Sequence, residues 1–199
     1  MTSSSPRIRD AGVDDAAILA ELVDMAGKGM PAHLWARMAA SGETPLDIGR
    51  RRAMRDTGSF SWRNAVVAER DGRVVACVVG YQLPDPPRPI DRDSTPAMLV
   101  PFQELENLAP GTWYVNFLAT LPAFRNQGIG TRLLIEAEAR AMAKGIGRLS
   151  IIVFDTNASA RRLYERRDFR FVATRPIVKE DWNGLGENLH LLMKNADAG

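Results

Sequence analysis

The chain has 199 residues, of which 45% are hydrophobic and 25% are charged, and its formal net charge is +2. These values fit one globular domain with a sizeable core, and the small net charge, without an aromatic-rich basic stretch, argues against nucleic acid as a partner. With Cys77 as the one cysteine and with two distant histidines, His33 and His190, an intrachain disulfide is excluded and a metal site is disfavoured.

Neither a signal peptide nor a membrane span is recognisable. The stretch 1–9 is polar, and the apolar runs fall far below the roughly 20 residues that cross a bilayer. We therefore expect a cytoplasmic protein that does not bind membranes. Residues 1–6 are expected to form a flexible tail, and residues 7–199 a single domain.

Helices dominate the first quarter, after a short strand at 7–9. A helix from Asp14 is indicated by apolar residues at three- and four-residue spacing, and Gly27 and Gly29 end it. A second helix is expected after Pro31, with Leu34 and Met38 facing inward. A third, over 45–56, carries arginines at positions 50, 51, 52 and 55. These arginines fit a solvated helix face better than an anion site, and both interpretations stay open.

From residue 64 the pattern changes to strands. Strands are predicted over 64–69 and 74–83, and Asp71-Gly72 between them is a strong hairpin signal. Five prolines within 84–96 predict a long loop, which inside a compact domain is often functional. A short helix near 99–105 follows.

The second half alternates strands and helices. Strands are predicted at 113–120, 149–154, 169–178 and 188–194, and helices at 128–144 and 157–167. Gly145 and Gly147 are expected to cap the first of these helices. This order indicates a mixed α/β fold.

The most informative segment is Arg125-Asn126-Gln127-Gly128-Ile129-Gly130-Thr131, which follows a strand and opens a helix. The first turn of a helix offers unpaired amides at its positive end, and glycines allow an anion to approach, so the segment suits a phosphate or pyrophosphate. Thr131-Arg132 after Gly130 rules out a Walker A loop, and Leu133 replaces the third glycine of a dinucleotide fingerprint. Taken alone, the glycine pair would favour a helix entry without a ligand.

Arg125-x-x-Gly128-x-Gly130 resembles the coenzyme A pyrophosphate loop of GNAT acetyltransferases, and the preceding 117–124 resembles the strand and turn before that loop. Downstream, the segment 157–165 resembles the family's second motif, with Asn157, alanines and Leu163-Tyr164. The resemblance covers most of the chain and is strongest over 113–171. It implies a GNAT-like fold, a mixed, mostly antiparallel twisted sheet flanked by helices, with acetyl-CoA as co-substrate and no metal.

The resemblance also implies an activity: an N-acetyltransferase that moves an acetyl group from acetyl-CoA to a primary amine through a tetrahedral intermediate. Asn157 would then hydrogen-bond the pantetheine, Tyr164 would protonate the leaving thiolate, and the Leu118 amide would polarise the thioester carbonyl. The implied cofactor-binding residues are Leu118, Ala119, Thr120, Arg125, Asn126, Gln127, Gly128, Ile129, Gly130, Thr131, Asn157 and Tyr164.

Each role has a plainer alternative. Asn157 can cap its helix, and Tyr164 can be a core aromatic residue. Cys77 fits a packed core residue better than a nucleophile.

The chain departs from the family pattern at two places. Asp168 stands where the second motif has glycine before Phe169. Asn116 lies where many members have an acidic residue; it cannot act as a base, although it can orient a water. Glu104 and Glu106, just upstream, are the candidates for the general base, with exposed helix carboxylates as the alternative.

The resemblance places the acceptor site at about 27–58 and 84–110, where the sequence fits a small-molecule or a peptide amine equally well. A homodimer is expected from the resemblance. Two other classes stay open: a non-catalytic acyl-CoA-binding sensor or protein-interaction module, and a binder of another nucleotide.

Overall fold

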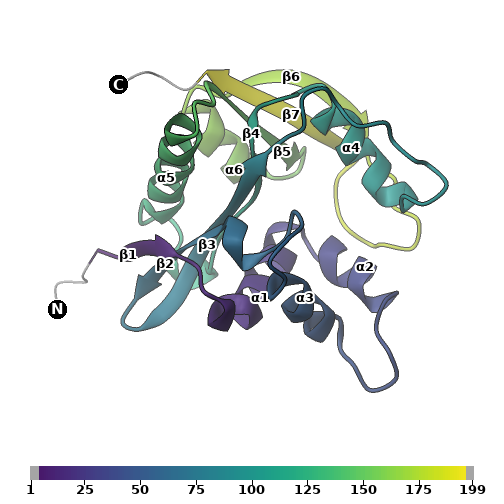
Figure 1. Ribbon diagram of the computed structural model, residues 1–199, viewed down its shortest axis with the longest axis horizontal. Coiled ribbons are helices and arrows are strands. Elements are labelled where there is room, and N and C mark those ends of the chain that lie inside the picture. Colours follow the sequence, from purple (N-terminus) through teal and green to yellow (C-terminus); the bar gives the residue numbers. More distant parts are fainter. Residues whose placement is uncertain (1–4, 196–199) are drawn as a thin grey trace. The chain divides into compact units, whose positions relative to one another are not determined.

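Seven strands form a mixed sheet in the order β1-β2-β3-β4-β5-β7-β6 in the computed structural model, which describes residues 5–195 (Figure 1). Among the strand pairs with a described register, β4 with β5 is parallel and the others are antiparallel. The predicted mixed, mostly antiparallel sheet with flanking helices is thereby confirmed. By its internal contacts the chain divides into two compact units: residues up to Gly80 with Phe117–Ala137, and Tyr81–Asn116 with the chain from Glu138.

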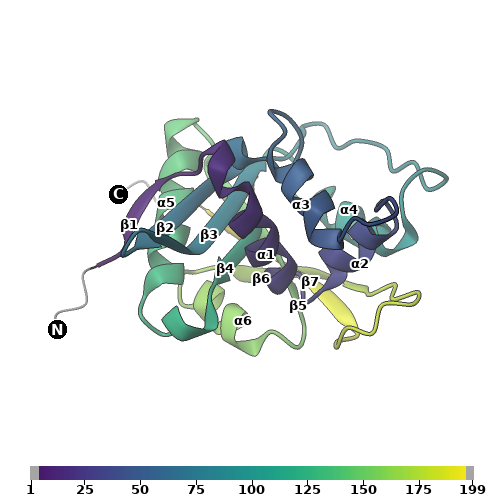
Figure 2. The ribbon, with the colours of Figure 1, turned by 90° about the horizontal axis from the view of Figure 1, so that it is seen from below.

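The first unit builds its core between helices and the first strands. Its elements are β1 (Arg7–Asp10), α1 (Ala16–Ala26), α2 (Met30–Ala36), α3 (Pro45–Ala53), β2 (Ala65–Arg70), most of β3 (Arg73–Gln82), the end of β4 (Trp113–Thr120) and most of α5 (Ile129–Ala143). Helices α1 and α3 lie side by side in Figure 2. Leu19 and Leu22 of α1 pack with Val67 of β2 and with the fully buried Cys77 of β3. The expectation that Cys77 is a packed core residue is therefore confirmed.

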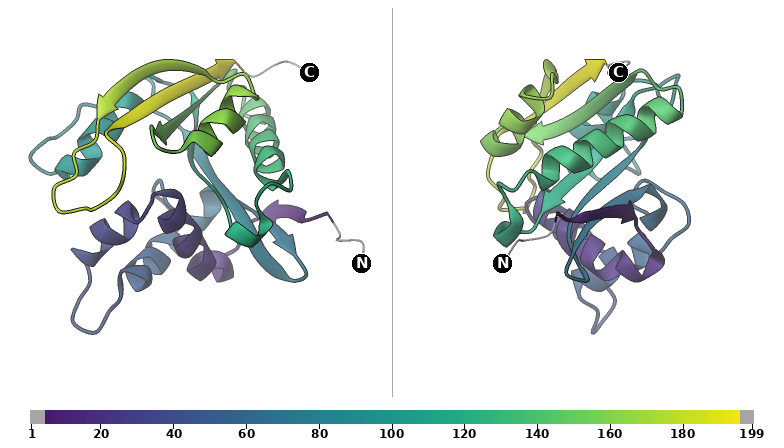
Figure 3. Two further views of the ribbon diagram at one scale, coloured as in Figure 1. Left: turned by 180° about the vertical axis from the view of Figure 1, so that it is seen from behind. Right: turned by 90° about the vertical axis from the view of Figure 1, so that its left-hand side faces the viewer.

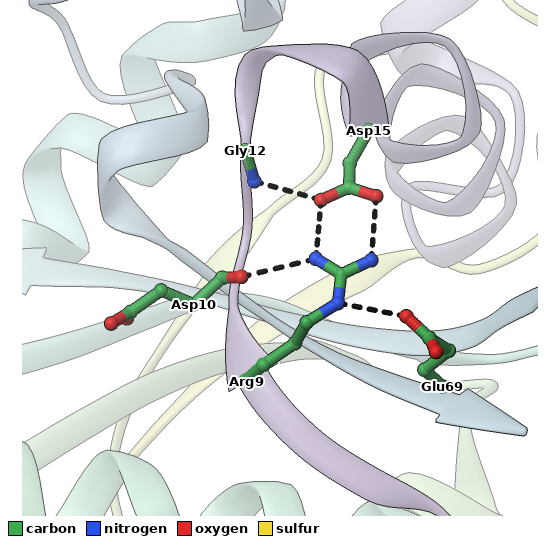
Figure 4. Close-up of polar contacts among 5 residues, drawn as sticks. All are labelled: Arg9, Asp10, Gly12, Asp15 and Glu69. Carbon is green, nitrogen blue, oxygen red and sulfur yellow. Dashed lines mark hydrogen bonds and ion pairs between the residues drawn. The ribbon is translucent and has the colours of Figure 1, made fainter. Parts of the chain in front are cut away.

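Arg9 ties β1 to the start of the helical layer and to β2 (Figure 4). Its Nη1 and Nη2 donate to the Asp15 carboxylate at 2.7 and 3.0 Å, and its Nε donates to Glu69 at 2.8 Å. The same carboxylate accepts the Gly12 amide at 2.7 Å. These hydrogen bonds, above all the one from Arg9, lower the pKa of Asp15, so the network stays ionised at neutral pH.

The hairpin between β2 and β3 forms at the predicted dipeptide. Asp71 and Gly72 have φ of +50° and +73°, as a two-residue type I′ turn requires. The register of the hairpin shifts once, between Ala68 and Glu69, and beyond this shift Val67 lies opposite Cys77.

The second unit consists of the C-terminal strands with two short helices. Its elements are α4 (Val100–Glu106), part of β4 (Trp113–Thr120), the end of α5 (Ile129–Ala143), β5 (Arg148–Phe154), α6 (Ala158–Glu165), β6 (Arg170–Pro176) and β7 (Asn188–Asn195). Strands β6 and β7 lie side by side (Figure 3). Phe154 of β5 contacts Phe102 of α4 and Trp182, with ring centroids 6.1 and 5.8 Å apart.

Some local expectations need correction. Helix α2 starts at Met30, before Pro31, and ends at Ala36. Met38 therefore lies beyond the helix, and its side chain is 56% exposed rather than inward-facing. Of the two glycines after α5, Gly145 alone has a left-handed φ, +72°, and it lets the Ile146 amide reach the Ala141 carbonyl at 2.9 Å.

Residues 1–4, most of the expected tail, lie outside the described residues.

Candidate active site

The glycine-rich segment forms an exposed loop at the start of α5, in the first unit. Asn126 and Gly128 have φ of +60° and +76°, and a Cβ added to Gly128 would meet no atom within 4 Å. Successive residues of unusual φ turn backbone amides toward a common point, which is the geometry of an anion-binding concavity. No described protein acceptor takes the amides of residues 126–128. The loop therefore offers open space and free donors to a phosphate.

The side chains of Arg125 and Gln127 stabilise this loop through hydrogen bonds to backbone carbonyls that precede it. Arg125 Nε donates to the Thr120 carbonyl at 3.1 Å, and Gln127 Nε2 donates to the Ala123 carbonyl at 3.2 Å. Arg70 Nη1 donates to Gln127 Oε1 at 2.7 Å. Because the side chains are turned toward their own loop and toward β2, the backbone is what the loop presents to a ligand.

Strand β4 carries Leu118, Ala119 and Thr120 into the same unit. Ala119 is 5% exposed and belongs to the core, whereas Leu118 and Thr120 are partly exposed. The Ala119 amide donates to the Cys77 thiol, whose pKa burial nonetheless raises to about 12. Cys77 is thus a buried neutral thiol.

Asn157 is the N-cap of α6, in the second unit, as its plainer interpretation predicted. Its Oδ1 accepts the Ala160 amide and the Ser159 hydroxyl, both at 3.3 Å. Among the described residues, its Nδ2 donates to none. Capping thus uses the oxygen of the amide and leaves its nitrogen for another acceptor.

Tyr164 lies in the last turn of α6 and is 5% exposed. Its ring packs against Phe169, with centroids 6.0 Å apart. Burial raises the pKa of its phenol, so that it stays protonated at neutral pH and can act as a proton donor.

Glu106 is the last residue of α4, and its carboxyl is partly buried. This carboxyl forms no hydrogen bond or ion pair with any other described residue. Burial raises its pKa to about 7, and the negative end of the helix dipole acts in the same direction. A carboxyl of this kind can both take up and release a proton near neutral pH.

Glu104, one of the two candidate bases, is held between two arginines. It accepts Arg92 Nη2 at 2.6 Å and Arg175 Nε at 2.8 Å. These hydrogen bonds lower its pKa. Glu104 therefore ties the proline-rich loop and β6 to α4, and its carboxylate is a poor proton acceptor at neutral pH.

Two tyrosines that the sequence did not single out, Tyr81 and Tyr114, contact each other in the second unit. Tyr114 of β4 is 2% exposed, and its ring meets that of Tyr81 edge-on, with centroids 5.7 Å apart. Burial raises the pKa of Tyr114, and the charges of Glu106, Tyr81 and Tyr164 add to this effect. Tyr114 thus contacts Tyr81 and interacts electrostatically with Glu106 and Tyr164.

Asn116 follows Tyr114 by two residues on β4 and is partly exposed. Because alternate residues of a strand share a face, Asn116 lies on the same face of β4 as Tyr114. The structure gives it no contact that tests a role in orienting water.

The comparison with protein-family models gives a match, and the comparison with curated protein sequences does not. A family model described as "Acetyltransferase (GNAT) family" matches residues 33–169. No curated protein sequence matches the chain.

Solved structures with a similar fold include an acetyltransferase that is 21% identical, with a TM-score of 0.65 over 96% of this chain and 100% of that one. An N-acetyltransferase from Staphylococcus aureus Mu50 is 18% identical, with a TM-score of 0.65 over 94% of this chain and 100% of its own. The putative acetyltransferase yncA from Salmonella typhimurium, solved with acetyl-CoA, is 20% identical, with a TM-score of 0.59 over 98% and 96%. At these identities the likeness concerns the fold.

None of the helices among residues 5–195 has the length and apolar character that crossing a membrane requires.

Proposed function

Because the chain belongs to the GNAT acetyltransferase family, we propose that it transfers the acetyl group of acetyl-CoA to a primary amine, with Glu106 as general base and Tyr164 as general acid. The acceptor would be a small-molecule or a peptide amine. A cytoplasmic location and a homodimer stay predictions.

The environment of Glu106 is the observation that carries this proposal. Its carboxyl is partly buried, has no ion-pair partner among the described residues, and has a pKa raised to about 7. A base of this pKa is substantially ionised at neutral pH and still basic enough to accept a proton, which is the optimum for general base catalysis. Glu104, held by Arg92 and Arg175, lacks these properties.

The phosphate loop supports acetyl-CoA as the donor. The free amides of 126–128 and the open space at Gly128 suit a pyrophosphate. Leu118–Thr120 would pair with the pantetheine arm, and the free Nδ2 of Asn157 would donate a hydrogen bond to it.

In the proposed reaction Glu106 takes one proton from the ammonium form of the acceptor, and the neutral amine nitrogen then attacks the acetyl carbonyl carbon. A backbone amide of β4, proposed to be that of Leu118, would stabilise the resulting oxyanion, a contribution of about 3 kcal/mol where such donors have been removed. The carbon–sulfur bond breaks as the tetrahedral intermediate collapses. Tyr164 gives its phenolic proton to the thiolate, and the nitrogen of the product loses its second proton to solvent. Tyr164 then recovers a proton from solvent, and Glu106 releases the one it took up. Asn116 is proposed to orient a water near the amine.

The test is an acetyl-transfer assay with a panel of primary amines, comparing Glu106→Gln with Glu104→Gln. Both variants change a carboxyl to an amide on the same helix. We expect Glu106→Gln to lower kcat by roughly 100-fold or more and Glu104→Gln to leave most of the turnover. Equal loss in both variants would exclude Glu106 as the base.

Tight binding of acetyl-CoA without turnover of any amine would contradict the enzymatic proposal altogether. That result would favour the non-catalytic acyl-CoA-binding alternative.

A further inference from the structure

Helix α3 and the turn after it carry four arginines, and among the described residues only Arg51 has an ion-pair partner. Between Met38 and Asn64 the chain has three acidic residues, and each is already engaged. Glu43 pairs with Arg51, Asp47 caps the helix through Thr44, and Asp56 pairs with Arg63 at 2.7 Å. No carboxylate of this segment is left for Arg52 or Arg55.

Arg52 lies in the last turn of α3, and the exposed Arg55 follows two residues after the end of the helix at Ala53. Arg55 Nε donates to the backbone carbonyl of Arg52 at 3.2 Å, which fixes the position of its guanidinium. Arg52 is half-buried, and its Nη1 lies 4.0 Å from Met38 Sδ, a weak acceptor. No other described residue forms an ion pair with either arginine.

The two guanidinium groups are close enough to repel each other. Burial lowers the pKa of Arg52, and the charge of Arg55 acts in the same direction. A half-buried charge without a partner destabilises a fold, so that the arrangement costs stability in the free protein. The forked donors of two neighbouring guanidinium groups match the oxygens of a carboxylate or a phosphate.

We propose that Arg52 and Arg55 form a binding site for an oxyanion, a carboxylate or a phosphate, that belongs to one of the two substrates. The assignment of the oxyanion to a substrate rests on the proposed acetyl transfer, whereas the anion site itself does not. Arg50, whose charge acts on Asp47, and Arg51, which pairs with Glu43, are not part of the site.

The anion site is tested without turnover, by following the arginine Nε–Hε signals in an NMR titration of the full chain with inorganic phosphate. We expect saturable shifts of the Arg52 and Arg55 signals and little change at Arg50. Thermal unfolding gives a second readout: phosphate should raise the Tm of the wild type. It should raise the Tm of Arg50→Gln/Arg51→Gln equally, and that of Arg52→Gln/Arg55→Gln much less. Equal responses of the two double variants would overturn the site.

The source of the oxyanion is tested by two pairs of ligands. If the acceptor carries it, Arg52→Gln/Arg55→Gln raises KM for an amino acid by roughly tenfold and leaves KM for the corresponding decarboxylated amine unchanged. If coenzyme A carries the oxyanion, the same variant binds acetyl-CoA more weakly by a similar factor. Its affinity for acetyl-CoA that lacks the ribose phosphate is then unchanged. Arg52→Lys/Arg55→Lys, which keeps the charge and loses the fork, should give an intermediate effect in either case.

Unchanged KM and unchanged acetyl-CoA affinity in the glutamine variant would overturn the assignment to a substrate. If no amine is turned over at all, the proposed function fails, and the phosphate titration still decides on the anion site.

Discussion

Glu104 and Glu106 lie two positions apart on α4, and their identical carboxyl groups have opposite electrostatic environments. Glu104 accepts hydrogen bonds from Arg92 and Arg175, which lower its pKa. Glu106 has no such partner, and burial raises its pKa to about 7. Within a single turn of α4, Glu104 is thus an anion held by arginines, and Glu106 is a carboxyl that can accept a proton near neutral pH.

The first prediction follows from this contrast and concerns the pH dependence of stability. In the folded state Glu106 has a pKa above its ordinary value of 4.5, so the folded protein binds this proton more tightly than the unfolded chain does. Its contribution to stability is therefore present below about pH 4.5 and is lost as the pH rises through about 7. We expect Glu106→Gln to be more stable than the wild type at pH 8, with the difference shrinking toward pH 5. Urea unfolding across this range measures it.

Glu104→Gln is the control for that series and should behave in the opposite way. The pKa of Glu104 is lowered in the fold, so its contribution is present at neutral pH and is lost as the pH falls through the folded-state value. A stability difference of the same sign in both variants would contradict the assigned environments.

The second prediction concerns Tyr164→Phe. The variant removes the proton donor and keeps the ring that packs against Phe169 at 6.0 Å. We expect kcat to fall by about 100-fold, while the affinity for acetyl-CoA and the unfolding midpoint change little. A thioester donor with a more acidic leaving thiol should restore part of the rate of this variant. An equal loss with both thioesters would show that Tyr164 does not protonate the leaving group.

The third prediction compares two glycines of similar backbone conformation. Gly128 and Gly145 have φ of +76° and +72°, and at both a Cβ would enter open space. A Glu at either position carries the same backbone strain, of roughly 1–2 kcal/mol. Only Gly128→Glu places a carboxylate in the phosphate loop, so we expect calorimetric titration to show acetyl-CoA binding lost in Gly128→Glu and kept in Gly145→Glu. Retained binding in Gly128→Glu would remove the loop from the cofactor site.

The fourth prediction concerns Asp168, which stands where the family motif has glycine. It adopts a left-handed φ of +64° and closes α6, a conformation that glycine adopts at little cost. We expect Asp168→Gly to stabilise the protein by about 0.5–1 kcal/mol in urea unfolding. Its ion pair with Arg170, at 3.3 Å, joins two exposed side chains. Arg170→Gln is therefore the control and should leave stability nearly unchanged.

The order of elements was largely predictable from the sequence, because hydrophobic period, turns and caps are local properties. Strand β4 has the predicted bounds, Trp113–Thr120, and the Asp71-Gly72 turn forms where its dipeptide indicates. Met38 was wrongly expected to face inward, since a helical pattern was extended beyond the end of α2 at Ala36.

The candidate site was only partly predictable, for a physical reason. The phosphate loop is a contiguous motif, and its backbone conformation follows from its glycines. The difference between Glu104 and Glu106 depends instead on Arg92 and Arg175, which approach from distant parts of the chain. Tyr81 and Tyr114 come together in the same way, and no local signal in the sequence marks them.

The burial of Cys77 has a practical consequence for every assay suggested above. It is the sole thiol of the chain, it is fully buried, and its pKa is raised to about 12. Disulfide dyes react with accessible thiolates, so the native protein should give no colour with them. Free coenzyme A released during turnover would then be the one chromogenic species in the cuvette. Acetyl transfer could be followed continuously, even at enzyme concentrations close to that of the product.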